Sequence, residues 1–182
     1  MASRIMHLTP EEYPVFLYGL GKAHRQTRLI IGLFLLAGMK MIEVLDMKII
    51  DLVRKEEPAD YIVAREGKRM GGGTRIIPVE VELSFFIESW FLKIVKHRVG
   101  WKYSDPAFPS RGRGVTVSRR AMEMLVNRAT RKIIGRSVGA AALRNTYGIE
   151  LAKKHDMKTV EKMMGLRSIG AAQRIKDLGE VM

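Results

Sequence analysis

Residues 139–175 read GAAALRNTYGIELAKKHDMKTVEKMMGLRSIGAAQRI, and this stretch decides the fold. It begins with an apolar helix start that carries Arg144 and continues into a second amphipathic helix. That second helix ends at Gly165, because glycine readily takes the left-handed backbone that stops a helix. Ser168 can then cap a last short helix. We therefore predict helices over 140–155, 157–164 and 169–178.

The composition indicates one basic domain. The chain has 182 residues and a formal net charge of +13, which is enough length for a substantial core. We expect a single domain over 1–182, with its core over 8–178. An excess of positive charge this large points to a polyanionic partner, most often nucleic acid. The alternative is a basic surface that serves solubility or membrane contact.

Several other classes of protein are disfavoured by the sequence. It contains no cysteine, so disulfides and thiolate metal sites are excluded. The longest apolar run, 29–39, contains Gly32 and Gly38 and is too short to span a bilayer. No signal-peptide pattern precedes it, so we expect a cytoplasmic, DNA-associated protein. Scarce Asn and Gln and the absence of Cys predict a thermophile source, although the twelve methionines point the other way.

The first half of the chain predicts two helices, a hairpin and a third long helix. Thr9 and Glu12 form a capping-box pattern around Pro10, which suits the first helical position. A second, largely apolar helix follows over 22–37. Two strands are predicted over 61–65 and 74–79, joined by the glycine-rich turn EGKRMGGG. An amphipathic helix is predicted over 81–98.

A basic helix follows a loop rich in Gly, Pro, Ser and Arg. Ser118 is a good N-cap, and apolar residues recur at helical spacing from Met122 to Ile133. The other face carries five cations and one acid, Glu123. The basic residues are Arg119, Arg120, Arg128, Arg131 and Lys132. DNA phosphates would relieve their mutual repulsion, and the alternative is a solvated surface. Arg111 and Arg113, in the preceding loop, could reach a groove or a phosphate.

Five pieces of the chain, in order, resemble the catalytic domain of the tyrosine recombinase (phage integrase) family. Leu143, Arg144 and Thr146 match a family segment of the type H-x-L-R-H-T, and Gly165 and Ser168 match the following L-G-H-S-S. The helix starts at Thr9 and Ser118 match the family's entries into its first helix and its basic helix.

Two further pieces lie in the first half. The sequence AGMKMIEVLDMKIIDL resembles T-G-L-R-x-x-E-L-L-x-L-x-x-x-D-I, with Glu43 and Asp51 on the family's structural acids. The hairpin resembles G-K-G-x-K-x-R-x-V-P-L, which in the family carries a general-acid lysine. Lys68 and Arg75 fit this pattern if two residues are inserted in the turn. The resemblance implies a mainly α fold with a small antiparallel β-sheet (α+β).

The groups that the family uses to cut DNA are replaced. Ile175 stands at the nucleophilic tyrosine, Leu166 at a His or Trp, and Ala141 and Asn145 at histidines. Lys40 replaces the first catalytic arginine, and lysine lacks the planar fork that holds two phosphate oxygens. The resemblance therefore implies DNA binding without cleavage, with no catalytic residue, metal ion or cofactor. The residues expected to contact DNA are Lys40, Lys68, Arg75, Arg111, Arg113, Arg119, Arg120, Arg128 and Arg144.

We expect double-stranded DNA as the partner, together with an active recombinase or with another copy of the chain. No part of the sequence matches the family's separate N-terminal DNA-clamping domain. Two other hypotheses remain. The first is a recombinase that takes its tyrosine from another protomer or uses Tyr147. The second is an RNA-binding or protein-assembly module on the same fold, which competition between duplex DNA and structured RNA would reveal.

Overall fold

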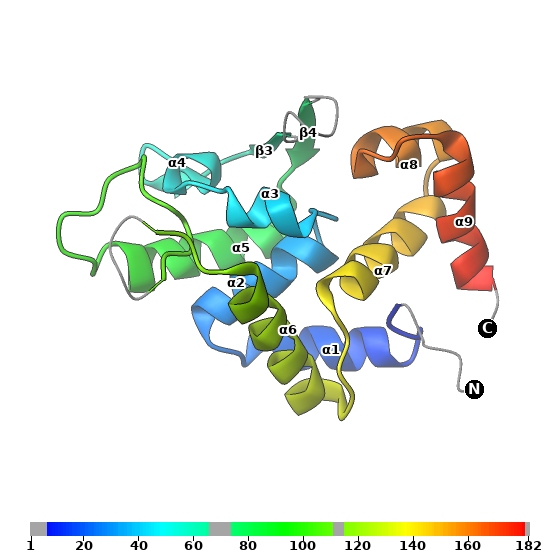
Figure 1. Cartoon of the computed structure of the whole chain (residues 1–182), viewed down its shortest axis with the longest axis horizontal. Helices are drawn as coiled ribbons and strands as arrows, with labels where there is room; N and C mark the ends of the chain where they lie inside the picture. The colour runs from blue at the N-terminus through cyan, green and yellow to red at the C-terminus, as the bar shows by residue number, and fades with distance from the viewer. Residues whose placement is uncertain (1–6, 66–73, 111–114, 181–182) are drawn as a thin grey trace.

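Figure 1 shows the computed structural model of the chain, which describes residues 7–65, 74–110 and 115–180. The helices are α1 (Glu12–Gly21), α2 (Arg25–Leu35), α3 (Met41–Leu45), α4 (Ile49–Leu52), α5 (Val81–Trp90), the π-helical η2 (Phe91–Val95), α6 (Arg119–Ile134), α7 (Ala140–Ala152), α8 (Met157–Met164) and α9 (Ile169–Glu180). The strands are β1 (Val53–Arg54), β2 (Glu57–Pro58), β3 (Tyr61–Arg65) and β4 (Thr74–Pro78). The strands form two antiparallel pairs. The predicted fold class, mainly α with a small antiparallel sheet, is confirmed.

Helix α2 lies at the centre of the main hydrophobic core. Residues 29–35 are all buried, and the helix packs against α5, α6 and α7 (Figure 1). Gly32 allows α5 to approach, because a methyl group there would lie 2.9 Å from a ring carbon of Phe86. A helix surrounded on all sides needs no polar face, which explains its long apolar run. Among the described residues, no helix is both long enough and apolar enough to cross a bilayer.

Helices α7, α8 and α9 enclose a second, smaller hydrophobic cluster, drawn yellow to red in Figure 1. Gly148 of α7 makes the packing close. A methyl group at this position would lie 2.5 Å from the sulfur of Met164 and 2.7 Å from the side chain of Ile175. The cluster therefore holds the C-terminal end of α8 next to α7.

The hydrogen bonds expected of the predicted helix caps are present, although α1 begins two residues after Pro10. The N–H of Thr9 donates to Glu12 Oε2 (2.9 Å), and the N–H of Glu12 donates to Thr9 Oγ1 (3.3 Å). Ser118 and Ser168 each accept a hydrogen bond from a first-turn N–H, at 3.2 and 3.3 Å. Gly165 takes the left-handed conformation after α8, with φ 58°. The polar residues thus fix where these helices begin and end.

The β3–β4 hairpin is confirmed, and its register places Tyr61 opposite Pro78 and Arg65 opposite Thr74. The small β1–β2 hairpin was not predicted. Its turn residues, Lys55 and Glu56, have φ of 50° and 66°, a conformation normally signalled by Asn or Gly. The helix predicted over 81–98 is instead α5 followed by η2, where the backbone adopts the wider π turn.

Candidate nucleic-acid interface

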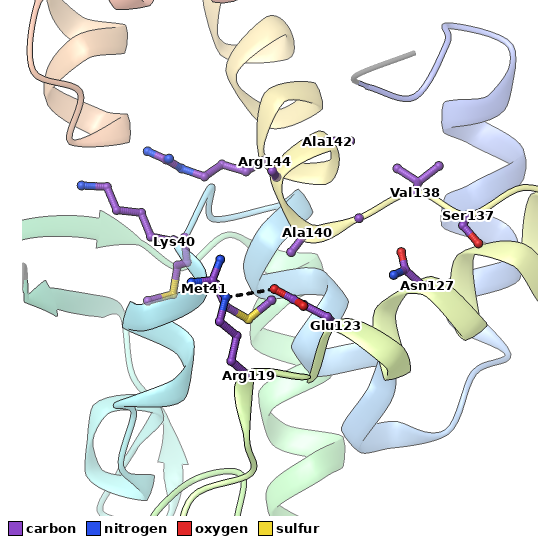
Figure 2. Close-up of a pocket in the computed structure, with 13 residues that line it drawn as sticks. Lys40, Met41, Arg119, Glu123, Asn127, Ser137, Val138, Ala140, Ala142 and Arg144 are labelled. Carbon is purple, nitrogen blue, oxygen red and sulfur yellow. Dashed lines mark hydrogen bonds and ion pairs between the residues drawn. The ribbon is translucent and has the colours of Figure 1, made fainter. Parts of the chain in front are cut away.

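A cavity of about 570 Å³ opens between the start of α3, one side of α6 and the start of α7 (Figure 2). Lys40, Arg119 and Arg144 contribute positive charge to its lining. Residues 139–142, at the N-terminus of α7, form one wall. The N-cap residue of α7 is Gly139, which supplies no side-chain cap hydrogen bond. The first-turn N–H groups of α7 and the helix dipole therefore make the wall electropositive.

Lys40 reaches the cavity from the turn between α2 and α3. Gly38 makes this turn at φ 56°, and a methyl group there would lie 2.2 Å from the ring of Tyr147. Lys40 is then the N-cap residue of α3, and its N–H donates to Glu43 Oε2 at 2.6 Å. In Figure 2, the side chains of Lys40 and Arg144 extend toward the same side of the cavity. Two of the residues expected to contact DNA therefore line one cavity.

Arg144 connects two walls of this site. Its Nε donates to the carbonyl of Gly38 at 2.8 Å, and its Nη2 donates to the carbonyl of Met164 at 2.5 Å. Met164 is the last residue of α8, where the helix dipole favours a cation. These carbonyls stabilise the guanidinium. Arginine near the start of α7 therefore does not by itself require an anion.

Arg75 is buried, which corrects the prediction that it contacts DNA. Its side chain is 6% exposed, and that of its partner Glu43 is 1% exposed. The guanidinium donates to Glu43 Oε2 at 2.6 Å, and also to the carbonyls of Met163 (2.5 Å) and Gly38 (3.3 Å). A buried arginine is tolerated when it is paired and hydrogen-bonded in this way. Arg75 therefore supports the turn that carries Lys40.

The basic residues of α6 do not all line the same hollow. Arg119 lines the 570 Å³ cavity, where its Nε pairs with Glu123 Oε1 at 2.9 Å. Arg128 and Lys132 line a separate groove against α1. Arg120 is exposed and lines neither hollow. Three of the five basic residues of α6 thus line two separate hollows.

Three polar residues of the cavity were missed by the sequence reasoning: Glu123, Asn127 and Ser137. The four-residue spacing of Arg119, Glu123 and Asn127 puts them on one side of α6, and this was the available signal. Ser137 gave no such signal, because it lies in the connection between α6 and α7.

Lys68, Arg111 and Arg113 lie outside the described residues, so their DNA contacts stay predictions. Within the described residues, no group of three or more His, Asp and Glu side chains could hold a metal ion.

Three of the positions at which the family has catalytic groups carry apolar side chains here: Ala141, Leu166 and Ile175. Ala141 lines the cavity with only a methyl group. Leu166 and Ile175 pack into the second hydrophobic cluster. In the described part of the cavity wall there is no tyrosine. Burial raises the pKa of Tyr147, which makes its phenolate harder to form.

Comparison with solved structures finds this fold in site-specific recombinases. XerA recombinase matches 96% of this chain with a TM-score of 0.75 and 19% identity, over 60% of its own chain. XerH recombinase, solved with its difH substrate before cleavage, matches 94% of this chain with a TM-score of 0.76 and 24% identity, over 50% of its own chain.

The integrase of mycobacterium phage Brujita matches 99% of this chain with a TM-score of 0.65 and 20% identity, over 57% of its own chain. This chain thus spans between half and three fifths of the length of these three structures. No protein-family model and no curated protein sequence matches it. From residue 7 to residue 180, the described chain has the fold of the tyrosine recombinase catalytic domain.

Proposed function

We propose that this chain binds double-stranded DNA and that the cavity between α3, α6 and α7 holds one backbone phosphate without cleaving the strand. One observation carries the proposal: Lys40, Arg144 and the N-terminus of α7 line the same cavity. A helix N-terminus with nearby cations is a typical arrangement for binding phosphate.

The charge of the whole chain favours the same partner. At +13, the protein attracts a polyanion from a distance. Each cation that contacts a phosphate releases counterion from the duplex, so binding must weaken steeply as salt rises. Arg119 adds a third cation at the cavity, although Glu123 partly neutralises it.

The structural neighbours support DNA as the polyanion. XerH recombinase was solved with its difH substrate. The Tn1549 transposon integrase was solved with circular-intermediate DNA, and it matches 96% of this chain with a TM-score of 0.70. We propose that this chain shares their DNA partner and a role related to recombination or integration.

The absence of cleavage is proposed from the chemistry of three positions. Attack on phosphorus needs an oxygen nucleophile, and Ile175 has none. Ala141 and Leu166 can neither donate nor accept a proton. Attack by Tyr147 in place of the missing nucleophile is disfavoured, because burial raises the pKa of its phenol. What remains is a group of cations that can bind a phosphate and cannot carry out the covalent step.

Binding of a labelled duplex across a salt series tests the DNA part of this proposal. We expect log affinity to fall linearly with log salt. Lys40→Ala should lower affinity about 3- to 10-fold and reduce the salt slope by about 1. Lys158→Ala is the matched control, since Lys158 is exposed on α8 and lies outside the cavity lining. A salt-independent affinity, or equal effects of the two substitutions, would contradict a phosphate site at Lys40.

A nicked suicide duplex, which traps covalent protein–DNA adducts, tests the absence of cleavage. We expect none under conditions where the duplex is fully bound. A covalent adduct with this protein alone would overturn the proposal and would favour attack by Tyr147 or by a tyrosine of another protomer. Competition with structured RNA at equal salt separates DNA binding from an RNA-binding role.

A further inference from the structure

A groove of about 760 Å³ lies between α1 and α6, apart from the phosphate cavity. Its lining includes three large apolar side chains that are more than half exposed: Val15 at 56%, Tyr18 at 70% and Met124 at 53%. Its cations are Lys22, Arg128 and Lys132. Among the described residues, no carboxylate lies within ion-pair distance of these cations. An apolar groove with a positive rim suits an amphipathic helix with acidic flanks.

The same chain carries such a helix on its surface. Val81, Phe85 and Glu88 fall at positions i, i+4 and i+7 of α5, and all three are exposed. Val81 is 82% exposed and Phe85 is 56% exposed. Glu82 is also exposed, beside Val81. In the part of the chain that the structure describes, neither Glu82 nor Glu88 forms an ion pair.

We propose that the outer side of α5 in one copy of this chain docks in the α1–α6 groove of a second copy. The apolar residues of α5 would enter between Val15, Tyr18 and Met124. Glu82 and Glu88 would then lie near the positive rim. Burying exposed apolar surface supplies the driving force, and the opposite charges orient the partners.

The match cannot be made within one copy. Helix α2 packs against both α5 and α6, which holds the two surfaces at fixed positions in one copy. They flank the start of this helix, because Thr27 lines the groove whereas the guanidinium of Arg28 lies 5.3 Å from the ring centre of Phe85. The contact joins two different surfaces, the outer side of α5 and the α1–α6 groove. A reciprocal dimer would therefore make the contact twice, and a head-to-tail assembly would make it once per copy.

Sedimentation equilibrium of the whole chain without DNA tests this contact. Mass should rise with concentration. Reversing the helix charges (Glu82→Lys with Glu88→Lys) or the groove charges (Arg128→Glu with Lys132→Glu) should each weaken self-association at least about tenfold. A mixture of the two reversed proteins should regain a heterodimer, because the basic helix of one fits the acidic groove of the other. This recovery also shows that both variants are folded.

The control variant combines Asp46→Lys with Asp177→Lys, which changes net charge as much as reversing the helix charges. Both residues are exposed and lie far along the chain from α5, at the end of α3 and on α9. It should associate like the wild type at matched ionic strength.

Three outcomes would overturn the proposed contact. They are a wild type that stays monomeric up to about 100 µM, reversed variants that associate as the wild type does, and a mixture that gives no heterodimer. DNA is absent from these measurements, so their failure would leave the proposed phosphate site untouched.

Discussion

Arg75→Met should destabilise the fold strongly while leaving in place the cations that line the proposed phosphate site. The substitution removes the partner of a carboxylate that is 1% exposed. It also removes two hydrogen bonds, to the carbonyls of Met163 and Gly38. Methionine fills much of the volume of arginine, so the main loss is electrostatic and not a cavity.

The size of the effect follows from leaving Glu43 charged and buried. Breaking a buried ion pair by removing one partner costs about 3–5 kcal/mol. For a chain of this length, each kcal/mol lowers the melting temperature by about 2–4 °C. The expected loss is therefore about 6–20 °C. Glu43 keeps one hydrogen bond, from the N–H of Lys40 at 2.6 Å, which places the loss toward the lower half of that range.

Thermal unfolding followed by circular dichroism measures this loss, and the double variant Arg75→Met with Glu43→Met is the control. Removing both charges should restore most of the stability, apart from about 1 kcal/mol for the lost capping bond to Lys40. The reasoning is refuted if Arg75→Met has the melting temperature of the wild type and instead weakens DNA binding. That result would restore Arg75 to the predicted DNA contacts.

Three further predictions concern stability. Burial, and then the charge of Arg136, lowers the pKa of His7 from 6.5. The unfolded chain therefore binds more protons, and stability should fall as pH drops below about 6.5. His7→Gln should flatten that part of a profile of melting temperature against pH, measured from pH 7.5 to 5. Gly38→Ala should cost about 2 kcal/mol or more by urea denaturation, because it combines a positive φ with a contact at 2.2 Å to Tyr147; a neutral result would mean that the turn relaxes. Ser118→Ala should cost about 1 kcal/mol in the same assay through loss of the α6 cap, and Ser118→Asp should not.

Local patterns predicted most elements, since caps and periodicity are encoded within a few residues. Helix α8 and strand β3 lie where the sequence placed them. The environment of Arg75 was not predictable in the same way. Strand alternation puts Arg75 and Ile77 on one side of β4 and Ile76 on the other. Only the tertiary fold shows that Glu43 lies on the buried side and pairs with Arg75. Ile76 is consequently 67% exposed, which reverses the usual expectation for an arginine next to isoleucines.

The division of charge on α6 has a similar cause. A single helix reveals which residues share a side, and this correctly grouped the buried Met122 and Val126. It does not reveal which neighbours cover the remaining sides. Arg128 lines the groove against α1, whereas Arg119 lines the cavity at the start of α7. Sequence pattern therefore identified the cations and could not assign them to a site.

Arg75 and Arg144 together hold the shape of the proposed phosphate site. Both donate to the carbonyl of Gly38, and they bind the consecutive carbonyls of Met163 and Met164 at the end of α8. The turn before Lys40 is thus tied to the C-terminal helices by contacts within the protein. Arg144 belongs to this framework as well as to the proposed site, so its replacement should alter stability and binding together. Lys40 lines the cavity from the N-cap of α3, so replacing it removes a cation from the lining and leaves these arginine–carbonyl contacts in place.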